Sequence, residues 1–191
     1  MNKIEKKVVE LAPPCTAQQL YLLGTYNPDG TILLQTQAFV SYVPGPPEGK
    51  LISVVYSEEM KENIKRENVF SLNLCNVDML PLVETAWRGY IPETTLSYLD
   101  GKKLKVPVLE SSPYVEELKV KELVPIGDTL IVIAETICVH ADKTLVHPYS
   151  DTDDLYEWYL KQNAQDYNPL MYCVKYYSLG ESLAVLDETN W

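Results

Sequence analysis

The chain has 191 residues, of which 46% are apolar and 23% charged, as in one ordinary folded domain. Twenty-seven acidic residues against 16 basic ones give a net charge of -11, so neither nucleic acid nor an anionic membrane is expected as a partner. No apolar run is long enough to span a membrane, and residues 1–10 lack the apolar stretch of a secretory signal, so we expect a cytoplasmic protein.

The N-terminal part is dominated by β-strand signals. Residues Leu20–Thr25 are apolar and β-forming, and the turn Pro28-Asp29-Gly30 predicts a hairpin with the next segment, Thr31–Val43. Residues 44–49 are rich in proline and glycine and are expected to form a loop. The apolar segment Leu51–Tyr56 then predicts a strand buried on both faces.

The hydrophobic period next changes to that of an amphipathic helix. Ser57 is a natural N-cap, and two acidic residues follow it in the first turn. Met60 and Ile64 form the apolar side of this helix. The side that we expect to face water carries Lys61, Glu62, Lys65 and Arg66.

Further strands and one helix follow along the chain. Residues Phe70–Cys75 alternate as in a strand, and Val77–Trp87 has apolar residues at helical spacing. Two apolar segments, Leu118–Val124 and Thr129–His140, flank the turn Pro125–Asp128 and predict a second hairpin.

The C-terminal part is more acidic. Residues Leu155–Gln165 have helical spacing and predict an acidic helical insertion around residues 150–166, and Leu170–Tyr177 predicts a short final strand. No repeat or linker divides the chain, so residues 1–191 are expected to form a single domain. Six or seven strands in hairpins, with two or three short helices, predict a mainly β protein built as a small antiparallel barrel.

The inventory of catalytic side chains is thin. Only His140 and His147 are present, no CxxC pair occurs, and we therefore expect no metal site. His140 is expected to be structural, and Glu116-Glu117 to lie on a solvated face or in the first turn of a helix. Because no phosphate-binding loop or nucleophile elbow occurs either, an enzyme of this kind would take its chemistry from a cofactor. The cysteines, each expected to be a small buried residue, are Cys15, Cys75, Cys138 and Cys173.

The order of several segments is informative as a set. These segments are Leu20–Thr25, Asp29-Gly30, Thr36–Ser41, Pro46-Pro47, Leu51–Tyr56, Glu62–Ile64, Phe70–Leu74, Ser112–Val120, Pro125–Thr129, Pro169–Tyr172 and Tyr176–Gly180. In this order they resemble the flavin reductase-like family, which includes flavoredoxins and the reductase partners of two-component monooxygenases. The resemblance covers about Pro13–Gly180, and no single motif in it is specific.

This resemblance implies an FMN-binding split β-barrel, antiparallel and of Greek-key topology, that forms a homodimer with flavin in the groove between barrels. It implies an oxidoreductase that passes hydride or electrons from NAD(P)H or a protein donor through FMN to an acceptor, so a redox partner protein is also expected. No catalytic side chain is implied, because the flavin carries the chemistry. The implied FMN-binding residues are Gln35, Thr36, Gln37, Ala38, Phe39, Ser41, Tyr56, Ser57, Met60 and Lys61.

Two alternatives remain open at this point. A split-barrel protein could bind flavin or another ligand without turnover, since Met60 cannot donate to a phosphate and Glu58 and Glu59 would repel one. The acidic helix expected over Leu155–Gln165 could be a lid or a docking surface for a redox partner.

Overall fold

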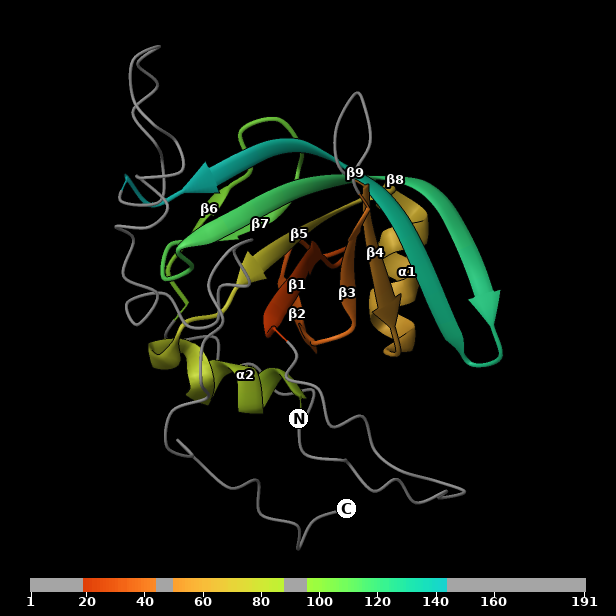
Figure 1. Cartoon of the computed structure of the whole chain (residues 1–191), viewed down its shortest axis with the longest axis horizontal. Coiled ribbons are helices and arrows are strands. Elements are labelled where there is room, and N and C mark those ends of the chain that lie inside the picture. The colour runs from red at the N-terminus through yellow and green to blue at the C-terminus, as the bar shows by residue number, and fades with distance from the viewer. Residues whose placement is uncertain (1–18, 44–49, 88–95, 144–191) are drawn as a thin grey trace, which may run out of the picture.

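The computed structural model describes residues 19–43, 50–87 and 96–143. Seven strands form one antiparallel sheet, and Figure 1 shows it curling beneath the long hairpin of its last two strands. In spatial order these strands are β2 (Ile32–Gln37), β1 (Tyr21–Tyr26), β5 (Val69–Leu74), β8 (Tyr114–Ile126), β9 (Thr129–Ala141), β4 (Lys50–Val55) and β3 (Val40–Val43). The remaining elements are a two-stranded sheet of β6 (Tyr98–Asp100) and β7 (Pro107–Leu109), the helices α1 (Glu58–Glu67) and α2 (Leu80–Trp87), and the 3-10 turn η1 (Val77–Met79). The predicted mainly β fold with short helices is confirmed.

The predicted first hairpin is confirmed as β1 and β2, with Tyr26 opposite Ile32. Its turn closes because the Gly30 amide donates to the Asn27 carbonyl at 2.9 Å, and Gly30 has a φ of +88°. Asp29 reinforces the turn by accepting from the Thr31 amide at 2.9 Å. The residue types within the turn itself were therefore enough to predict the hairpin.

The prediction of one continuous strand over Thr31–Val43 is wrong. The strand breaks at Ala38 and Phe39, whose amides both donate to the side-chain oxygen of Gln37 at 3.0 Å. β2 then pairs with β1, whereas β3 pairs with β4 at the other edge of the sheet. Since three residue steps span at most about 11 Å, the short connection from Gln37 to Val40 brings both sheet edges to one corner. No pairing joins β2 directly to β3 among the described residues.

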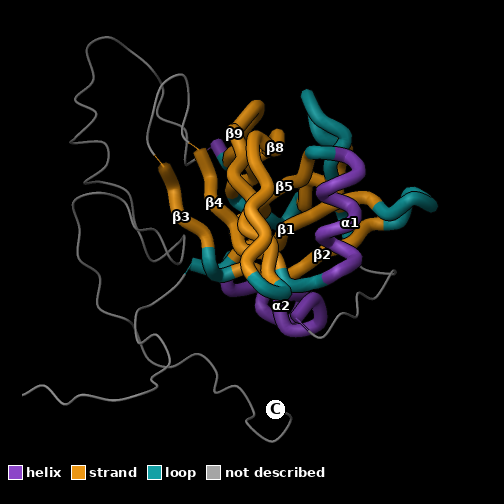
Figure 2. The backbone as a smooth tube through the Cα atoms, turned by 90° about the vertical axis from the view of Figure 1, so that its right-hand side faces the viewer, coloured by secondary structure: helices purple, strands orange, loops and turns teal. Residues whose placement is uncertain are grey.

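Two hydrophobic cores lie on opposite faces of the first strand, and β1 contributes to both because its side chains alternate. Leu23 lies in the first core with residues from α1, β5, β8 and β9, while Leu22 lies in the second core, beside α2. The predicted apolar side of α1 is confirmed, since Met60 and Ile64 are fully buried in the first core. Figure 2 shows the two helices against different parts of the curled sheet.

The predicted second hairpin is also confirmed, as β8 and β9 around Gly127. β8 begins at Tyr114, earlier than predicted, and the register of the pair shifts between Glu117 and Leu118. Such a bulge changes which side chains meet across the two strands.

Four expectations lie outside the described residues: the loop at 44–49, the acidic helix within 150–166, the last strand at 170–177 and the burial of Cys15 and Cys173. Within the described ranges, no helix is long and apolar enough to cross a membrane.

Candidate functional site

The two segments expected to bind flavin meet at the corner between β2 and β3. The side-chain oxygen of Gln35 accepts a hydrogen bond from the Ser57 amide at 3.2 Å. Nearby, the rings of Phe39 and Tyr56 meet edge to face, with centroids 6.2 Å apart. We call the group of Gln35, Gln37, Phe39, Tyr56 and Ser57 the corner site.

Gln37 carries a buried hydrogen-bond donor with no partner. Its side chain is 1% exposed, and its oxygen is identified by the two amides, those of Ala38 and Phe39, that donate to it. The other terminal atom is therefore Nε2, which lacks any hydrogen-bond partner in the described part of the chain. Burying an unpaired donor costs about 1–3 kcal/mol, so Nε2 is a polar group whose hydrogen bonding the described residues leave incomplete.

The corner site also contains two exposed aromatic side chains. Phe39 is 42% exposed and Tyr56 54% exposed, which is unusual for side chains of this size next to a core. A flat aromatic ligand suits such an arrangement, because one of the two rings, which lie at 72° to each other, can stack on its face while the other meets its edge. Ala38 is half-buried beside them, and Ser41 is exposed on β3.

Three of the expected flavin residues have their side chains turned into the protein. The Thr36 hydroxyl is buried and donates to the carbonyl of Val83 on α2 at 2.6 Å. Met60 is fully buried, and its sulfur accepts from the Thr25 hydroxyl at 3.4 Å. These contacts, together with those of Lys61, leave the three side chains outside the corner site.

Lys61 also corrects a sequence-based expectation, because it does not face water. Its side chain is only 6% exposed, and its ammonium group donates to Glu58 at 2.6 Å and to the carbonyl of Asp128. The physical reason is that α1 lies against the turn between β8 and β9, which covers one more side of the helix than the hydrophobic pattern indicates.

The electrostatics at the start of α1 are mixed. Ser57 is the N-cap, as predicted, and its hydroxyl accepts from the Met60 amide at 3.3 Å. The hydrogen bond and charge of Lys61 lower the pKa of Glu58, which is therefore ionised at neutral pH. Glu59 is exposed in the same first turn. An anionic group here would meet two carboxylates beside the favourable helix amides.

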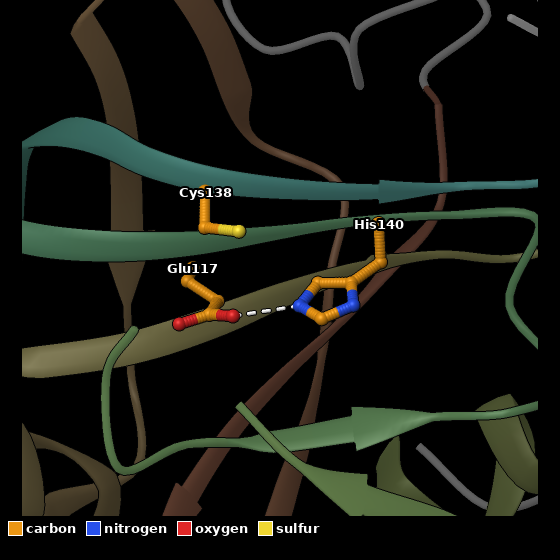
Figure 3. Close-up of side chains that lie close together, drawn as sticks. All are labelled: Glu117, Cys138 and His140. Atoms are coloured by element: carbon orange, nitrogen blue, oxygen red, sulfur yellow. Dashed lines mark hydrogen bonds and ion pairs between the residues drawn. The ribbon is translucent and has the colours of Figure 1, made fainter. Parts of the chain in front are cut away.

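A second polar cluster was missed by the sequence analysis. Glu117 on β8 lies beside Cys138 and His140 on β9 (Figure 3), and the carboxylate accepts from the His140 ring at 2.6 Å. The expected solvated position of Glu116-Glu117 is wrong, because the two residues are 4% and 0% exposed. Strand alternation places Cys138 and His140 on one face, but only the register places Glu117 opposite Cys138.

The Glu117 carboxylate is held by backbone amides. It accepts from the amides of Lys102 at 2.6 Å, Lys103 at 2.8 Å and Leu104 at 2.6 Å. Burial acts to raise the pKa of Glu117, but the hydrogen bonds from His140 and these amides hold it below its usual range. Burial and the adjacent Glu117 carboxylate raise the pKa of the Cys138 thiol.

A shallow hollow lies at the other end of the first hairpin. It has a volume of about 490 Å³ and is lined by Tyr26, Gly30, Tyr98, Leu99, Asp100 and Lys105. The Tyr26 hydroxyl donates to Asp100 at 2.6 Å, and burial together with this carboxylate raises the pKa of Tyr26. Because Tyr26 pairs with Ile32 while Gln37 pairs with Tyr21, the hollow and the corner site lie at opposite ends of the β1–β2 hairpin.

The fold just described is that of the flavin reductase-like split-barrel proteins, which confirms the resemblance seen in the sequence. Flavoredoxin from Methanosarcina acetivorans matches with a TM-score of 0.68 and 17% identity over 97% of both chains. Nitrilotriacetate monooxygenase component B from Bacillus cereus has a TM-score of 0.64 and 10% identity, covering 75% of this chain and 86% of its own. The FMN-binding protein from Thermus thermophilus has a TM-score of 0.63 and 12% identity, covering 73% and 83%. No protein-family model matches the chain, and no curated protein sequence matches it.

Proposed function

We propose that this protein is a flavin-dependent oxidoreductase that binds FMN at the corner site and passes hydride or electrons from NAD(P)H or a protein donor to an acceptor. The observation that carries the proposal is the buried, unpaired Nε2 of Gln37, whose side-chain oxygen accepts from the amide of Phe39, the exposed residue whose ring meets that of Tyr56. It lies in the segment where the family resemblance expects the flavin, and the fold is one that flavin-binding proteins share.

Each residue of the corner site would have a distinct task. Gln37 would donate from Nε2 to an acceptor atom on the edge of the flavin ring, which orients the ring. Phe39 and Tyr56 would cover part of the ring and exclude water. The hydrogen bond from Ser57 to Gln35 keeps the two binding segments at a fixed separation. When bound, the flavin itself supplies the hydride and electron transfer.

The residues present fit the flavin ring better than the phosphate of FMN. The only cation on α1 near its start, Lys61, already pairs with Glu58, and Glu59 adds a further negative charge. We therefore expect riboflavin to bind within about tenfold of FMN, a difference of no more than about 1.4 kcal/mol.

A flavin titration of the purified full chain tests the proposal. FMN and riboflavin are added separately and binding is followed by flavin fluorescence. Tyr56→Ala should weaken binding about fivefold or more, because base-like rings that stack on an aromatic side chain lose about 1–3 kcal/mol when it is removed. The matched control is Tyr98→Ala, an exposed tyrosine at the hollow, which should leave the affinity unchanged.

The outcomes separate the alternatives. Absence of flavin binding, or weakening by Tyr98→Ala instead of Tyr56→Ala, would refute the corner site. Anaerobic addition of NADH or NADPH to the flavin complex then tests turnover by bleaching of the flavin absorption. Binding without bleaching by either nucleotide would favour a protein donor or the non-catalytic flavin-binding alternative.

We also propose that the protein works as a homodimer in the cytoplasm, with the flavin in a groove between subunits. Exposed aromatic side chains near the corner support this, since Tyr42 on β3 is 59% exposed and lies close along the chain to Phe39. Light scattering after gel filtration gives the mass in solution, and a monomer at micromolar concentration would refute the dimer.

A further inference from the structure

The proposed function makes no use of three side chains on the second hairpin: Glu117, Cys138 and His140. The carboxylate, thiol and imidazole ligand atoms all lie within 4.8 Å of one another. Figure 3 shows the three side chains converging from β8 and β9, with the Glu117 carboxylate directed at the His140 ring. Carboxylate oxygen, thiolate sulfur and imidazole nitrogen are the three ligand types that zinc binds in proteins.

Hydrogen bonds fix the orientation of the Glu117 carboxylate, so that its last free lone pair points in a single direction. One of its oxygens accepts from the amides of Lys103 and Leu104, which uses both lone pairs of that atom. The other oxygen accepts from the Lys102 amide and has one lone pair left, which lies toward His140. Hydrogen bonds that orient a ligating carboxylate in this way are the usual outer support of metal sites.

The loop that supplies these amides has little freedom. A side chain at Gly101 would collide with the Leu104 carbonyl and come within 3.0 Å of the Glu117 carboxylate. The amides can therefore close around Glu117 only because residue 101 is glycine. The carboxylate is fully buried, while Cys138 and His140 are half-buried and reachable from the surface.

We propose that Glu117, Cys138 and His140 bind one divalent transition-metal ion of the zinc class, with a fourth position open to water or another ligand. On binding, the Cys138 S–H bond breaks, the proton leaves to solvent and a sulfur–metal bond forms. His140 ligates through Nε2, so the proton that Nε2 donates to Glu117 is lost to solvent and Nδ1 carries the proton of the neutral ring. Bonds from both side chains to the metal replace the hydrogen bond between them. The carboxylate and thiolate charges together balance the 2+ ion, which suits a half-buried site.

The competing explanation is a structural cluster in which His140 and the Cys138 thiol both interact with the Glu117 carboxylate by hydrogen bonding. Such a cluster needs no metal ion. The two explanations differ in one measurable respect: only a metal site bonds the sulfur of Cys138 to an added metal ion.

The test uses the full chain without a histidine tag, reduced and freed of metal with EDTA, then titrated with Co²⁺ under anaerobic conditions. We expect one Co²⁺ per chain and a thiolate-to-cobalt charge-transfer band, which Zn²⁺ should abolish by displacement. Cys138→Ser should remove the band, and His140→Asn should weaken binding tenfold or more. The matched control His147→Asn, in the only other histidine of the chain, should bind Co²⁺ unchanged.

Two results would overturn the proposal. One is the absence of a charge-transfer band in the folded parent protein at millimolar Co²⁺. The other is a band that survives in folded Cys138→Ser, which would place the thiolate on another of the four cysteines. Circular dichroism of each variant shows whether it is folded, and because Cys138→Ser and His140→Asn are independent changes, either folded variant is sufficient to decide.

Discussion

Replacing Glu117 by glutamine should destabilise the protein strongly, although the two side chains have nearly the same shape. Glu117 is fully buried, and three backbone amides and His140 donate to its carboxylate. Glutamine has one acceptor oxygen instead of two, and its amino group faces at least one of the same donors. The variant therefore loses the charge and leaves at least one buried N–H without a partner.

The magnitude follows from the contacts. The best orientation of the amide keeps its oxygen toward Lys103 and Leu104 and leaves the Lys102 amide facing another donor. An unpaired buried donor costs about 1–3 kcal/mol, and each of the two retained bonds weakens by about 1 kcal/mol when its acceptor loses the charge. Glu117→Gln should thus lower the free energy of unfolding by about 3–5 kcal/mol, a large part of the 5–15 kcal/mol typical of a domain.

Urea denaturation at pH 7 with EDTA, followed by circular dichroism, measures this loss apart from any metal effect. The matched control is Glu122→Gln on the same strand, whose side chain is exposed and should change stability by no more than about 0.5 kcal/mol. A loss below about 1 kcal/mol for Glu117→Gln would mean that the loop at 102–104 does not depend on the carboxylate.

Three further predictions concern the same scaffold. Gly101→Ala should lower the unfolding free energy by about 1–3 kcal/mol through its collision with the Leu104 carbonyl, and an unchanged melting temperature would contradict this. Burial raises the pKa of Glu116 above its ordinary value of 4.5. The contribution of this side chain to the free energy of unfolding is therefore lost as the pH rises through the folded-state pKa. Glu116→Gln should therefore become increasingly more stable than the parent between pH 4 and pH 8, and a constant difference in urea denaturation would argue against this. Burial raises the pKa of Cys75 to about 12. Iodoacetamide at pH 8 should therefore label this thiol only after unfolding. Labelling of the native protein, detected by peptide mass spectrometry, would show instead that solvent reaches the second core.

Local signals in the sequence were enough for the first hairpin, the cap of α1 and the strand at β5. The turn at Asn27–Gly30 closes with its own backbone and the Asp29 side chain, and Ser57 caps the helix that follows it. Such contacts join residues a few positions apart, so residue type and spacing are sufficient to predict them. The order of segments was also informative, because it resembled a family whose fold the structure shares.

Contacts between distant segments were decided only by the tertiary structure. The side-chain oxygen of Gln37 accepts from the amides of Ala38 and Phe39 in place of a neighbouring strand. Residue propensities do not predict such a break. Lys61 is buried because the β8–β9 turn lies against its helix.

The cluster on the second hairpin shows the same limit most clearly. Glu117 meets Cys138 because of the register of β8 and β9, and that register shifts at a bulge next to Glu117. A shift of one residue would turn every side chain of one strand to the opposite face. Alternation in the sequence determines that Cys138 and His140 share a face, but the pairing of the two strands decides which carboxylate they meet.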